Sequence, residues 1–334
     1  MGRGRTTQVN LTTSGAQEMF EVTVIIPTFR RSDQLSQCLL GVANQTRPPA
    51  ETIVVLREDD EETRAYLSSD RMPLHLKQVT VTRPGVIEAM AAGLKSSKTP
   101  FVAFTDDDAI PRPDWLERLT GDFADAHVGA SGGRDLVGGP LAPGEPLKDV
   151  VGLLTSWGRL RGNHHIGQGP ARDVNVLKAV NCMYRAEAAA IPRNLRGSGA
   201  QVHFEVGMGL WAQSRGWRIV YDPQTLVDHY PGPRFDRDSR SRPAQSAVYD
   251  AAYNLTFIIA SFGTSLAIRR TLFALAIGDR SSPGLLTALL SLVRSDERRV
   301  VLPRTKPALS GTLLAAFDII RGRRLKFYHF PLDE

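Results

Sequence analysis

Hydrophobic residues in the first 110 positions alternate between short runs rich in β-branched side chains and longer stretches with helical spacing. The β-rich runs predict strands at residues 22–27, 52–56, 76–81 and 101–105. The stretches between them predict helices at residues 34–44, 61–67 and 86–96. This alternation is typical of a mostly parallel sheet with helices on both faces. Because ligands of such sheets bind at the carboxyl ends of the strands, the residues that follow each strand are where chemistry is expected.

The pattern changes twice in the rest of the chain. Residues 132–173 are rich in Gly, Pro and polar side chains, and we interpret them as a long functional loop region. After this region the pattern predicts a strand at residues 174–180, a helix containing residues 205–214 and a strand at 218–221. Beyond residue 231 the apolar spacing becomes helical, at residues 251–277, 285–293 and 309–320. The carboxyl-terminal third is therefore predicted to be helical.

Composition is that of a globular protein, since 42% of the 334 residues are hydrophobic. No run of 18 or more apolar residues is free of charge, and the first 20 residues lack the apolar core of a signal peptide, so we expect a cytoplasmic protein. Cys38 and Cys182 have no paired spacing, which favours neither a disulfide framework nor a zinc site. Both are expected to be buried.

The net charge of +6 is concentrated in the carboxyl-terminal third. Residues 231–334 contain 16 Lys and Arg against 9 Asp and Glu, whereas the preceding residues contain 25 against 26. An excess of this kind attracts lipid phosphates, an anionic acceptor or nucleic acid. No nucleic-acid-binding motif accompanies it, so we expect no nucleic-acid partner.

The last predicted helix combines an apolar face with a basic end. The apolar residues at helical spacing are Leu309, Leu313, Leu314, Phe317 and Ile320. Residues 321–324 follow as Arg-Gly-Arg-Arg, a combination suited to peripheral contact with an anionic membrane, here the inner face of the cell membrane. The alternative is a helix packed on the preceding domain or on a second subunit, and we prefer that alternative for residues 285–293.

Three adjacent carboxylates, Asp106, Asp107 and Asp108, follow the predicted strand at residues 101–105. Such groups repel one another unless a divalent cation neutralises them. Oxygen ligands in small number suit Mg²⁺ or Mn²⁺ with positions left open for diphosphate oxygens. The alternative is a solvated acidic turn that caps the next helix.

The sequence Val-Ile-Ile-Pro-Thr-Phe-Arg-Arg at residues 24–31 resembles the opening signature of family 2 glycosyltransferases with the GT-A fold. Later motifs occur in the order expected for that family. They are Arg-Pro-Gly at 83–85, the aspartates with Pro-Arg-Pro-Asp-Trp at 111–115, Asn-Cys-Met-Tyr-Arg at 181–185, Glu205, Tyr-Asp-Pro at 221–223 and Val-Asp-His at 227–229. The resemblance covers residues 22–234 and implies a Rossmann-like, mostly parallel sheet flanked by helices.

The resemblance implies a donor site and a metal site. The residues that it assigns to the nucleotide pocket or its border are Pro27, Thr28, Arg30, Arg83, Asp106 and Asp107. Asp106 contacts ribose or metal-bound water in this interpretation, Asp108 binds the metal directly, and His229 completes the site. The implied donor is a nucleotide-diphosphate sugar, with a UDP-sugar as the first candidate.

Glu205 lies where family members carry the general base of inverting transfer. Its alternative role is that of a glutamate favoured by the positive end of a helix dipole. The second strand ends in Leu-Arg-Glu-Asp-Asp where relatives have Asp-Asp-Gly-Ser, so the contact to the nucleobase is left open among Glu58, Asp59 and Asp60.

Four residues are candidates for the acceptor side. Arg134, His164 and His165 fall in the predicted loop region, and similar segments in relatives border the acceptor; an ordinary surface loop is the alternative. Trp211 offers a face for stacking a sugar ring, although packing in the core is the commoner role of Trp.

These assignments divide the chain into a flexible segment at 1–20, a catalytic domain at 21–235 and a basic helical region at 236–334. The donor half of the domain covers 21–110 and the acceptor half covers 111–235. The acceptor is expected to be a glycan, a lipid-linked molecule or a small molecule, and the oligomeric state is left open. A relative that binds nucleotide sugars without catalysis is the alternative function.

Overall fold

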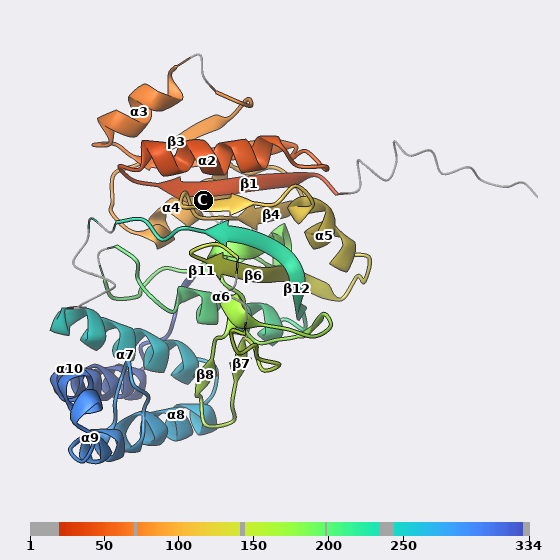
Figure 1. The fold of residues 1–334 in the computed structure, drawn as a ribbon. Helices are drawn as coiled ribbons and strands as arrows, with labels where there is room; N and C mark the ends of the chain where they lie inside the picture. Colours follow the sequence, from red (N-terminus) through yellow and green to blue (C-terminus); the bar gives the residue numbers. More distant parts are fainter. Residues whose placement is uncertain are drawn as a thin grey trace, which may run out of the picture.

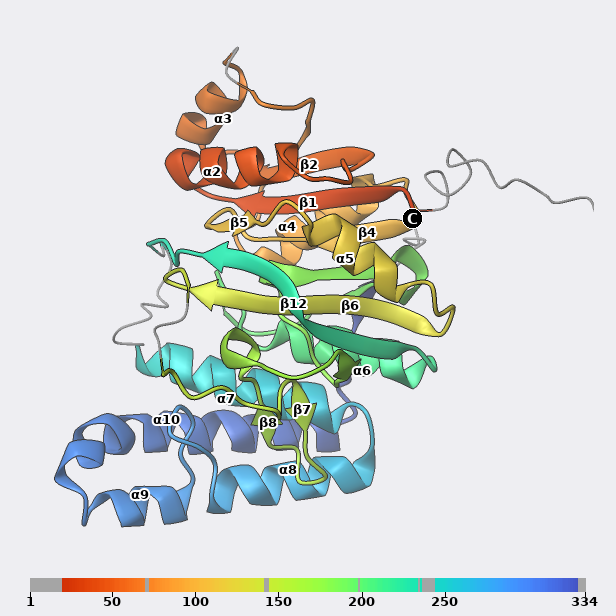
Figure 2. The same ribbon diagram turned by 45° about the vertical axis from the view of Figure 1, so that its right-hand side comes forward.

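The computed structural model describes residues 20–69, 72–140, 144–197, 199–233, 235 and 244–329. Nearly all of the segment predicted to be flexible, residues 1–20, lies outside this part of the chain. Within it, a central sheet has the order β3-β2-β1-β4-β10-β6-β12-β5, and β9 pairs with β12. Figures 1 and 2 show helices on both sides of this sheet and a separate layer of helices beyond its second half.

The first half of the sheet confirms the elements predicted for the first 110 residues. Its parallel strands are β1 (Val22–Thr28), β2 (Glu51–Arg57), β3 (Lys77–Val81) and β4 (Phe101–Phe104). Its helices are α2 (Ser32–Ala43), α3 (Glu61–Leu67) and α4 (Val86–Ser96). Successive residues of β1 enter different cores, because Ile25 packs with α4 whereas Val24 and Ile26 pack with α2. Burial on both faces explains the continuous apolar runs.

The second half of the sheet is mixed. Its strands are β5 (Ala109–Pro111), β6 (Val128–Val137), β9 (Arg172–Asp173), β10 (Cys182–Arg185) and β12 (Arg218–His229). β10 runs antiparallel between β4 and β6, whereas β12 runs parallel to β6. The helices α5 (Trp115–Asp122) and α6 (Phe204–Ser214) cover this half. Cys38 and Cys182 are buried and free, as predicted.

Two predictions about this half are wrong. Residues 132–134 do not belong to a loop region but to the central strand β6. Their glycines reflect close packing, because a Cβ on Gly133 would lie 1.9 Å from the carbonyl oxygen of Thr225 on β12. Residues 174–180 form no strand, although most are buried. Their backbone N–H groups bond to separate elements, that of Val174 to Ile219 and that of Val176 to Gly152, so burial occurs without a strand ladder.

The carboxyl-terminal region is helical, as predicted, with different boundaries. Its helices are α7 (Gln245–Ala260), α8 (Thr264–Ala276), α9 (Leu285–Ser291) and α10 (Ser295–Ile320). The predicted helix at 251–277 is divided after residue 260, where Gly263 has a φ of 152°. Two short pairings lie outside the central sheet in the described residues: β7 (Leu153–Leu154) with β8 (Leu160–Arg161), and β11 (Ala190–Pro192) with β13 (Phe327–His329). No helix in the described part of the chain has the length and apolar character needed to cross a membrane.

Candidate active site

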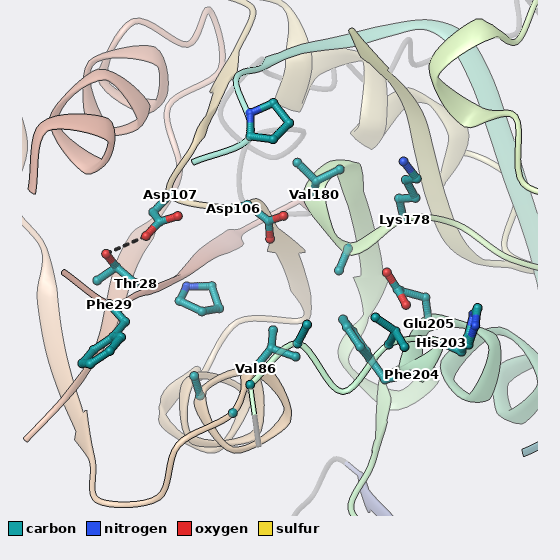
Figure 3. Close-up of a pocket in the computed structure, with 18 of the residues that line it drawn as sticks. Thr28, Phe29, Val86, Asp106, Asp107, Lys178, Val180, His203, Phe204 and Glu205 are labelled. Carbon is teal, nitrogen blue, oxygen red and sulfur yellow. Dashed lines mark hydrogen bonds between the residues drawn. The ribbon is translucent and has the colours of Figure 1, made fainter. Parts of the chain in front are cut away.

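A cavity of about 690 Å³ lies at the carboxyl ends of β1 and β4. One wall comes from the residues after these strands, including Thr28 and Asp106. The opposite wall comes from residues 176–180 and the beginning of α6, where Glu205 lies. Figure 3 shows these two walls facing each other, with Val86 at the beginning of α4 between them. The cavity thus joins the donor and acceptor halves that the sequence predicts.

Asp106, Asp108 and His229 gather at one side of this cavity. One potential ligand atom from each of the three lies within 4.8 Å of the others. His229 is 121 residues from Asp108 in the chain, but its strand β12 pairs with β5, where His229 lies opposite Ala109. His229 Nε2 is consequently 3.2 Å from Asp108 Oδ1. The structure therefore brings together the three residues predicted to hold a metal.

The chemistry of these three side chains fits a divalent cation. Asp108 Oδ1 and His229 Nε2 are buried and have no hydrogen-bond partner among the described residues, since their short separation lacks hydrogen-bond alignment. A buried polar atom without a partner costs free energy unless another ligand satisfies it. Two carboxylates and one imidazole are suitable ligands for Mn²⁺ or Mg²⁺.

The pKa values show how strongly these groups interact. Burial, together with the neighbouring Asp108, raises the pKa of Asp106 to about 7. Burial alone lowers the pKa of His229, but the carboxylates of Asp108 and Asp135 more than offset this and raise it to about 9. Burial opposes ionisation of Asp108 as well, yet His229 and the backbone N–H of Gly232 hold its pKa below the usual value. The raised pKa of Asp106 reflects burial and repulsion from the neighbouring carboxylates, which a bound cation would relieve.

Asp135 supports His229 from behind and was missed in the sequence. Its Oδ2 lies 3.6 Å from His229 Nδ1 and accepts a hydrogen bond of 2.7 Å from Lys178. A carboxylate in this position orients a metal-binding imidazole so that the other ring nitrogen faces the metal. In the sequence, Asp135 is only a single acidic residue after Arg134. It would point to the site only if residues 132–137 were recognised as part of a strand.

Arg31 borders the cavity, whereas Arg30, which was predicted to do so, does not. Arg30 has a φ of 54°, and its side chain is half exposed. Arg31 donates to Asp107 at 2.7 Å and to Asp108 at 3.3 Å, and it also donates to the Pro233 carbonyl. Thr28 donates to the other oxygen of Asp107 at 2.8 Å (Figure 3). Thr28, Asp107 and the predicted Pro27 do line the cavity.

None of the three candidates for the nucleobase contact is among the described residues that line the cavity. Asp60 is buried and begins α3, where it accepts hydrogen bonds from the backbone N–H groups of Thr63 and Arg30. Asp59 is exposed and pairs with Arg57 at 2.6 Å, and Glu58 is exposed. Arg57, by contrast, lines the cavity.

We expect Asp60→Ala to destabilise the fold, because it leaves the buried N–H of Thr63 in the first turn of α3 without an acceptor. The loss should be about 1–3 kcal/mol in the free energy of unfolding. Chemical denaturation of the wild type and the variant measures it, and Asp59→Ala on the neighbouring exposed position is the control. Equal stability of both variants would contradict the structural role of Asp60.

Glu205 occupies the first turn of α6 and lines the cavity. The preceding residue but one, His203, has a φ of 75° and turns the chain into the helix. In Figure 3 the Glu205 side chain points from α6 into the cavity, on the wall opposite Thr28 and Asp107. Its charge contributes to the raised pKa of Asp106, so the two carboxyl groups share one electrostatic environment.

The residues predicted for the acceptor side are dispersed. His164 is buried at the cavity, with Nε2 2.8 Å from the Val176 carbonyl oxygen, and burial lowers its pKa to about 4. His165 is half-buried and does not line the cavity. Arg134 donates to the Pro223 carbonyl oxygen outside the cavity lining, and Trp211 stacks on His329, with ring centroids 6.1 Å apart. Only His164 of these four is therefore positioned at the site.

Arg83 is exposed and lies outside the cavity lining. The residues that follow it, Pro84, Gly85 and Val86, do line the cavity. Lys178 and Phe29 line it as well, and neither was singled out from the sequence. Lys178 was hidden because residues 174–180 were interpreted as a strand.

Residues 20–246 match the family described as glycosyltransferase like family 2. The chain belongs to this family. The match covers the two halves of the sheet and both walls of the cavity, and it includes Asp106, Asp108 and His229. The family resemblance predicted from residues 22–234 is confirmed.

Named relatives and solved structures agree with membership in family 2. The pre-mycofactocin glycosyltransferase of Mycobacterium tuberculosis is 28% identical over 218 residues, which are 63% of this chain and 42% of that protein. The mannosyltransferase PcManGT from Pyrobaculum calidifontis, solved with GDP-Man and Mn²⁺, has a TM-score of 0.55 and 17% identity, covering 91% of this chain and 88% of that one. S. aureus TarS 1-349 with UDP-GlcNAc has a TM-score of 0.55 and 15% identity, covering 91% and 93%.

These likenesses confirm the predicted GT-A fold of this family 2 chain. The matched segment spans less than half of the mycobacterial relative. The activity and substrates of that relative are therefore not assigned to this chain. The two solved structures carry nucleotide sugars with different bases, and the shared fold therefore does not select a base.

Proposed function

We propose that this family 2 protein is an inverting glycosyltransferase that moves a sugar from a nucleotide-diphosphate donor to an acceptor hydroxyl. The observation that carries the proposal is the placement of Glu205 in the same cavity as the cluster of Asp106, Asp108 and His229. One wall offers a site for a cation and a diphosphate, and the other offers a carboxylate able to accept a proton. Inverting transfer needs both on opposite sides of the reacting carbon.

The donor is proposed to lie along the wall formed by β1, β2 and the aspartates. Phe29 and Arg57, which line this wall, are positioned for the nucleoside, with a UDP-sugar as the proposed donor. Arg31 holds Asp107 and Asp108 in place by its hydrogen bonds to both. Asp106, Asp108 and His229 would hold Mn²⁺ or Mg²⁺, and Asp135 orients the imidazole of His229.

In the reaction, the Glu205 carboxylate takes the proton of the acceptor hydroxyl. The hydroxyl oxygen then forms a bond to the anomeric carbon while the bond to the diphosphate breaks on the opposite side, and the diphosphate leaves with the electron pair. The bound cation supplies neutralisation of the negative charge that develops on this leaving group. Since one carboxylate serves as the base and the displacement occurs once, the configuration of the anomeric carbon is inverted.

The acceptor is proposed to be a glycan, a lipid-linked molecule or a small molecule, entering beside His164 and Lys178. A cytoplasmic location stays a prediction from the sequence. The alternative function, binding of nucleotide sugars without catalysis, gives no role to a carboxylate placed like Glu205, and we therefore prefer the enzyme.

Calorimetric titration of the wild type with UDP, GDP and dTDP, each with and without Mn²⁺, tests the donor site. We expect one nucleotide, UDP, to bind at least about tenfold more tightly with Mn²⁺, because the cation links the diphosphate to the carboxylates. The enzyme should then release free nucleoside diphosphate from the matching nucleotide sugar in the presence of an acceptor mixture. Absence of binding by all three nucleotides would overturn the proposal, and binding without release would favour the non-catalytic alternative.

A further inference from the structure

Helix α9 presents its leucines to solvent and its small residues to the protein. Leu285, Leu286, Leu289 and Leu290 lie within one arc of the helix, because residues one, four and five positions apart share a face. Their exposed fractions are 57%, 49%, 61% and 58%. On the other side, Ser291 is fully buried and Ala288 is half-buried. This is the reverse of a helix that packs its apolar face into its own domain.

The exposed apolar surface continues beyond the helix. Leu292 and Val293, which follow α9, are 50% and 87% exposed. We call these two residues and the four leucines of α9 the leucine face. The adjoining helix α8 exposes Ile268 and Leu272 as well, and Ile277, which follows it, is also exposed. A contiguous run of this kind on a globular protein marks a surface that another body covers.

The surroundings of the leucine face are basic. Residues 264–324 contain 11 Lys and Arg against 4 Asp and Glu. Arg280, Arg294, Arg298 and Arg299, which flank α9 in the sequence, are all exposed. Among the nearby acids, Asp279 accepts hydrogen bonds from Ser281 and Ser282, and Glu297 lies 3.7 Å from Arg294. Asp296 is exposed, so the arginines outnumber the acids around the leucine face but do not stand alone. A partner that covers the leucine face is therefore expected to offer both an apolar interior and negative charge.

We propose that the leucine face docks on the surface of an anionic lipid bilayer. Leucines inserted at the level of the acyl chains, with arginines at the level of the phosphates, combine the two attractions that hold a peripheral protein at a membrane. A second copy of this chain fits less well, since a two-fold interface through the leucine face would bring two copies of the same arginine-rich surround together.

The position of α9 agrees with a docked protein whose site faces the same side. In both Figure 1 and Figure 2 the arrowhead of β12 points to the side on which α9 lies. β12 is parallel to β6, and β10 runs antiparallel between β6 and β4, so the carboxyl ends of β1 and β4, where the cavity lies, are directed to that side. The docking itself does not depend on the proposed catalytic function.

The last helix keeps part of the apolar face that the sequence predicted, because Leu313, Phe317 and Ile320 are 55%, 44% and 83% exposed, and its contact with a membrane stays a prediction. Of the five apolar residues on the last helix, Leu309 and Leu314 are half-buried, and Leu314 packs in the core with α7. Phe317 is partly covered by Arg321, whose guanidinium carbon lies 4.0 Å from the ring centroid. For residues 285–293 the sequence favoured packing on the preceding domain or on a second subunit; the exposed leucines do not pack on the preceding domain, and packing on a second subunit stays a prediction.

Co-sedimentation of the full chain with phosphatidylcholine vesicles that contain phosphatidylglycerol tests the proposal. The wild type should bind, and Leu289→Gln should bind about tenfold less, the effect of removing one inserted leucine. The matched control is Leu40→Gln, which changes a leucine 45% exposed on α2, at the opposite end of the molecule (Figure 1). This control should bind like the wild type, and circular dichroism checks that both variants are folded.

A second variant tests the charge. Arg298→Glu with Arg299→Glu should reduce binding to the anionic vesicles by at least about tenfold, and vesicles of phosphatidylcholine alone should bind the wild type weakly. Failure of the wild type to bind anionic vesicles, or undiminished binding by Leu289→Gln, would overturn the proposal. A wild-type dimer in light scattering that Leu289→Gln converts to a monomer, without any vesicle binding, would assign the leucine face to a second copy instead.

Discussion

Asp108→Ala should abolish metal-dependent nucleotide binding. Asp108 contributes a buried oxygen, Oδ1, that accepts no hydrogen bond from the described residues and lies 3.2 Å from His229 Nε2. Loss of this ligand should weaken nucleotide binding in Mn²⁺ by at least about 100-fold. Turnover should fall about a thousandfold, because the charge of the departing diphosphate is then neutralised less well. Calorimetry and release of the nucleotide diphosphate measure the two effects.

The control for this variant is Asp228→Ala. Asp228 precedes His229 on β12, but its carboxylate pairs with Arg112 at 3.1 Å, outside the cavity lining. Removal of that pair should leave metal-dependent binding within about twofold of the wild type, since exposed ion pairs contribute little. Mn²⁺ should also raise the melting temperature of the wild type and of Asp228→Ala, but not of Asp108→Ala. Equal metal responses of all three proteins would refute the assignment of Asp108.

Glu205→Gln should separate catalysis from binding. The amide preserves the size of the side chain at the start of α6 but cannot accept the proton of an acceptor hydroxyl. We expect kcat to fall by about 10²- to 10⁴-fold, the range for loss of a general base. Because Glu205 is not a member of the metal-binding cluster, the affinity for nucleotide with Mn²⁺ should change little. Steady-state kinetics, with calorimetry of nucleotide binding, measure this difference.

Glu117→Gln provides the matched control for this substitution. Glu117 is exposed on α5 and accepts a hydrogen bond from Thr46, away from the cavity. Its amide variant should retain full turnover. If Glu205→Gln kept turnover within a few-fold of the wild type, the general base would have to be another residue, and the anomeric configuration of the product would decide whether inversion itself holds.

The elements of the donor half could be predicted closely because their pattern is local. Continuous apolar runs such as residues 53–56 of β2 pack alternate side chains into the two cores on either side of the sheet. The helices between the strands each carry one apolar face. The wrong predictions concern segments in which the burial of side chains does not indicate how the backbone is hydrogen-bonded. Residues 174–180 are as apolar as a strand, but their backbone N–H groups bond to several different segments. Gly133 suggested a loop in the sequence, whereas in the fold it permits close packing of β6 and β12.

The site shows the same division. Asp106, Asp108, Glu205 and His229 were recognisable by their order along the chain; Asp106, Glu205 and His229 line one cavity, and Asp108 lies beside Asp106 and His229. The choice between Arg30 and Arg31 was not open to the sequence. Both follow the same strand, and only the turn after β1 decides which side chain reaches Asp107.

The sequence by itself determined the family, the order of the elements in the donor half, the acidic cluster and the helical, basic character of the last third. These properties follow from local spacing and residue chemistry. The tertiary structure alone decided that Asp135 supports His229, that Asp60 stabilises α3 and that the leucines of α9 face solvent. Each of these depends on which distant segment packs against a residue, because burial and hydrogen-bond partners are properties of the folded chain rather than of a side chain's neighbours in sequence.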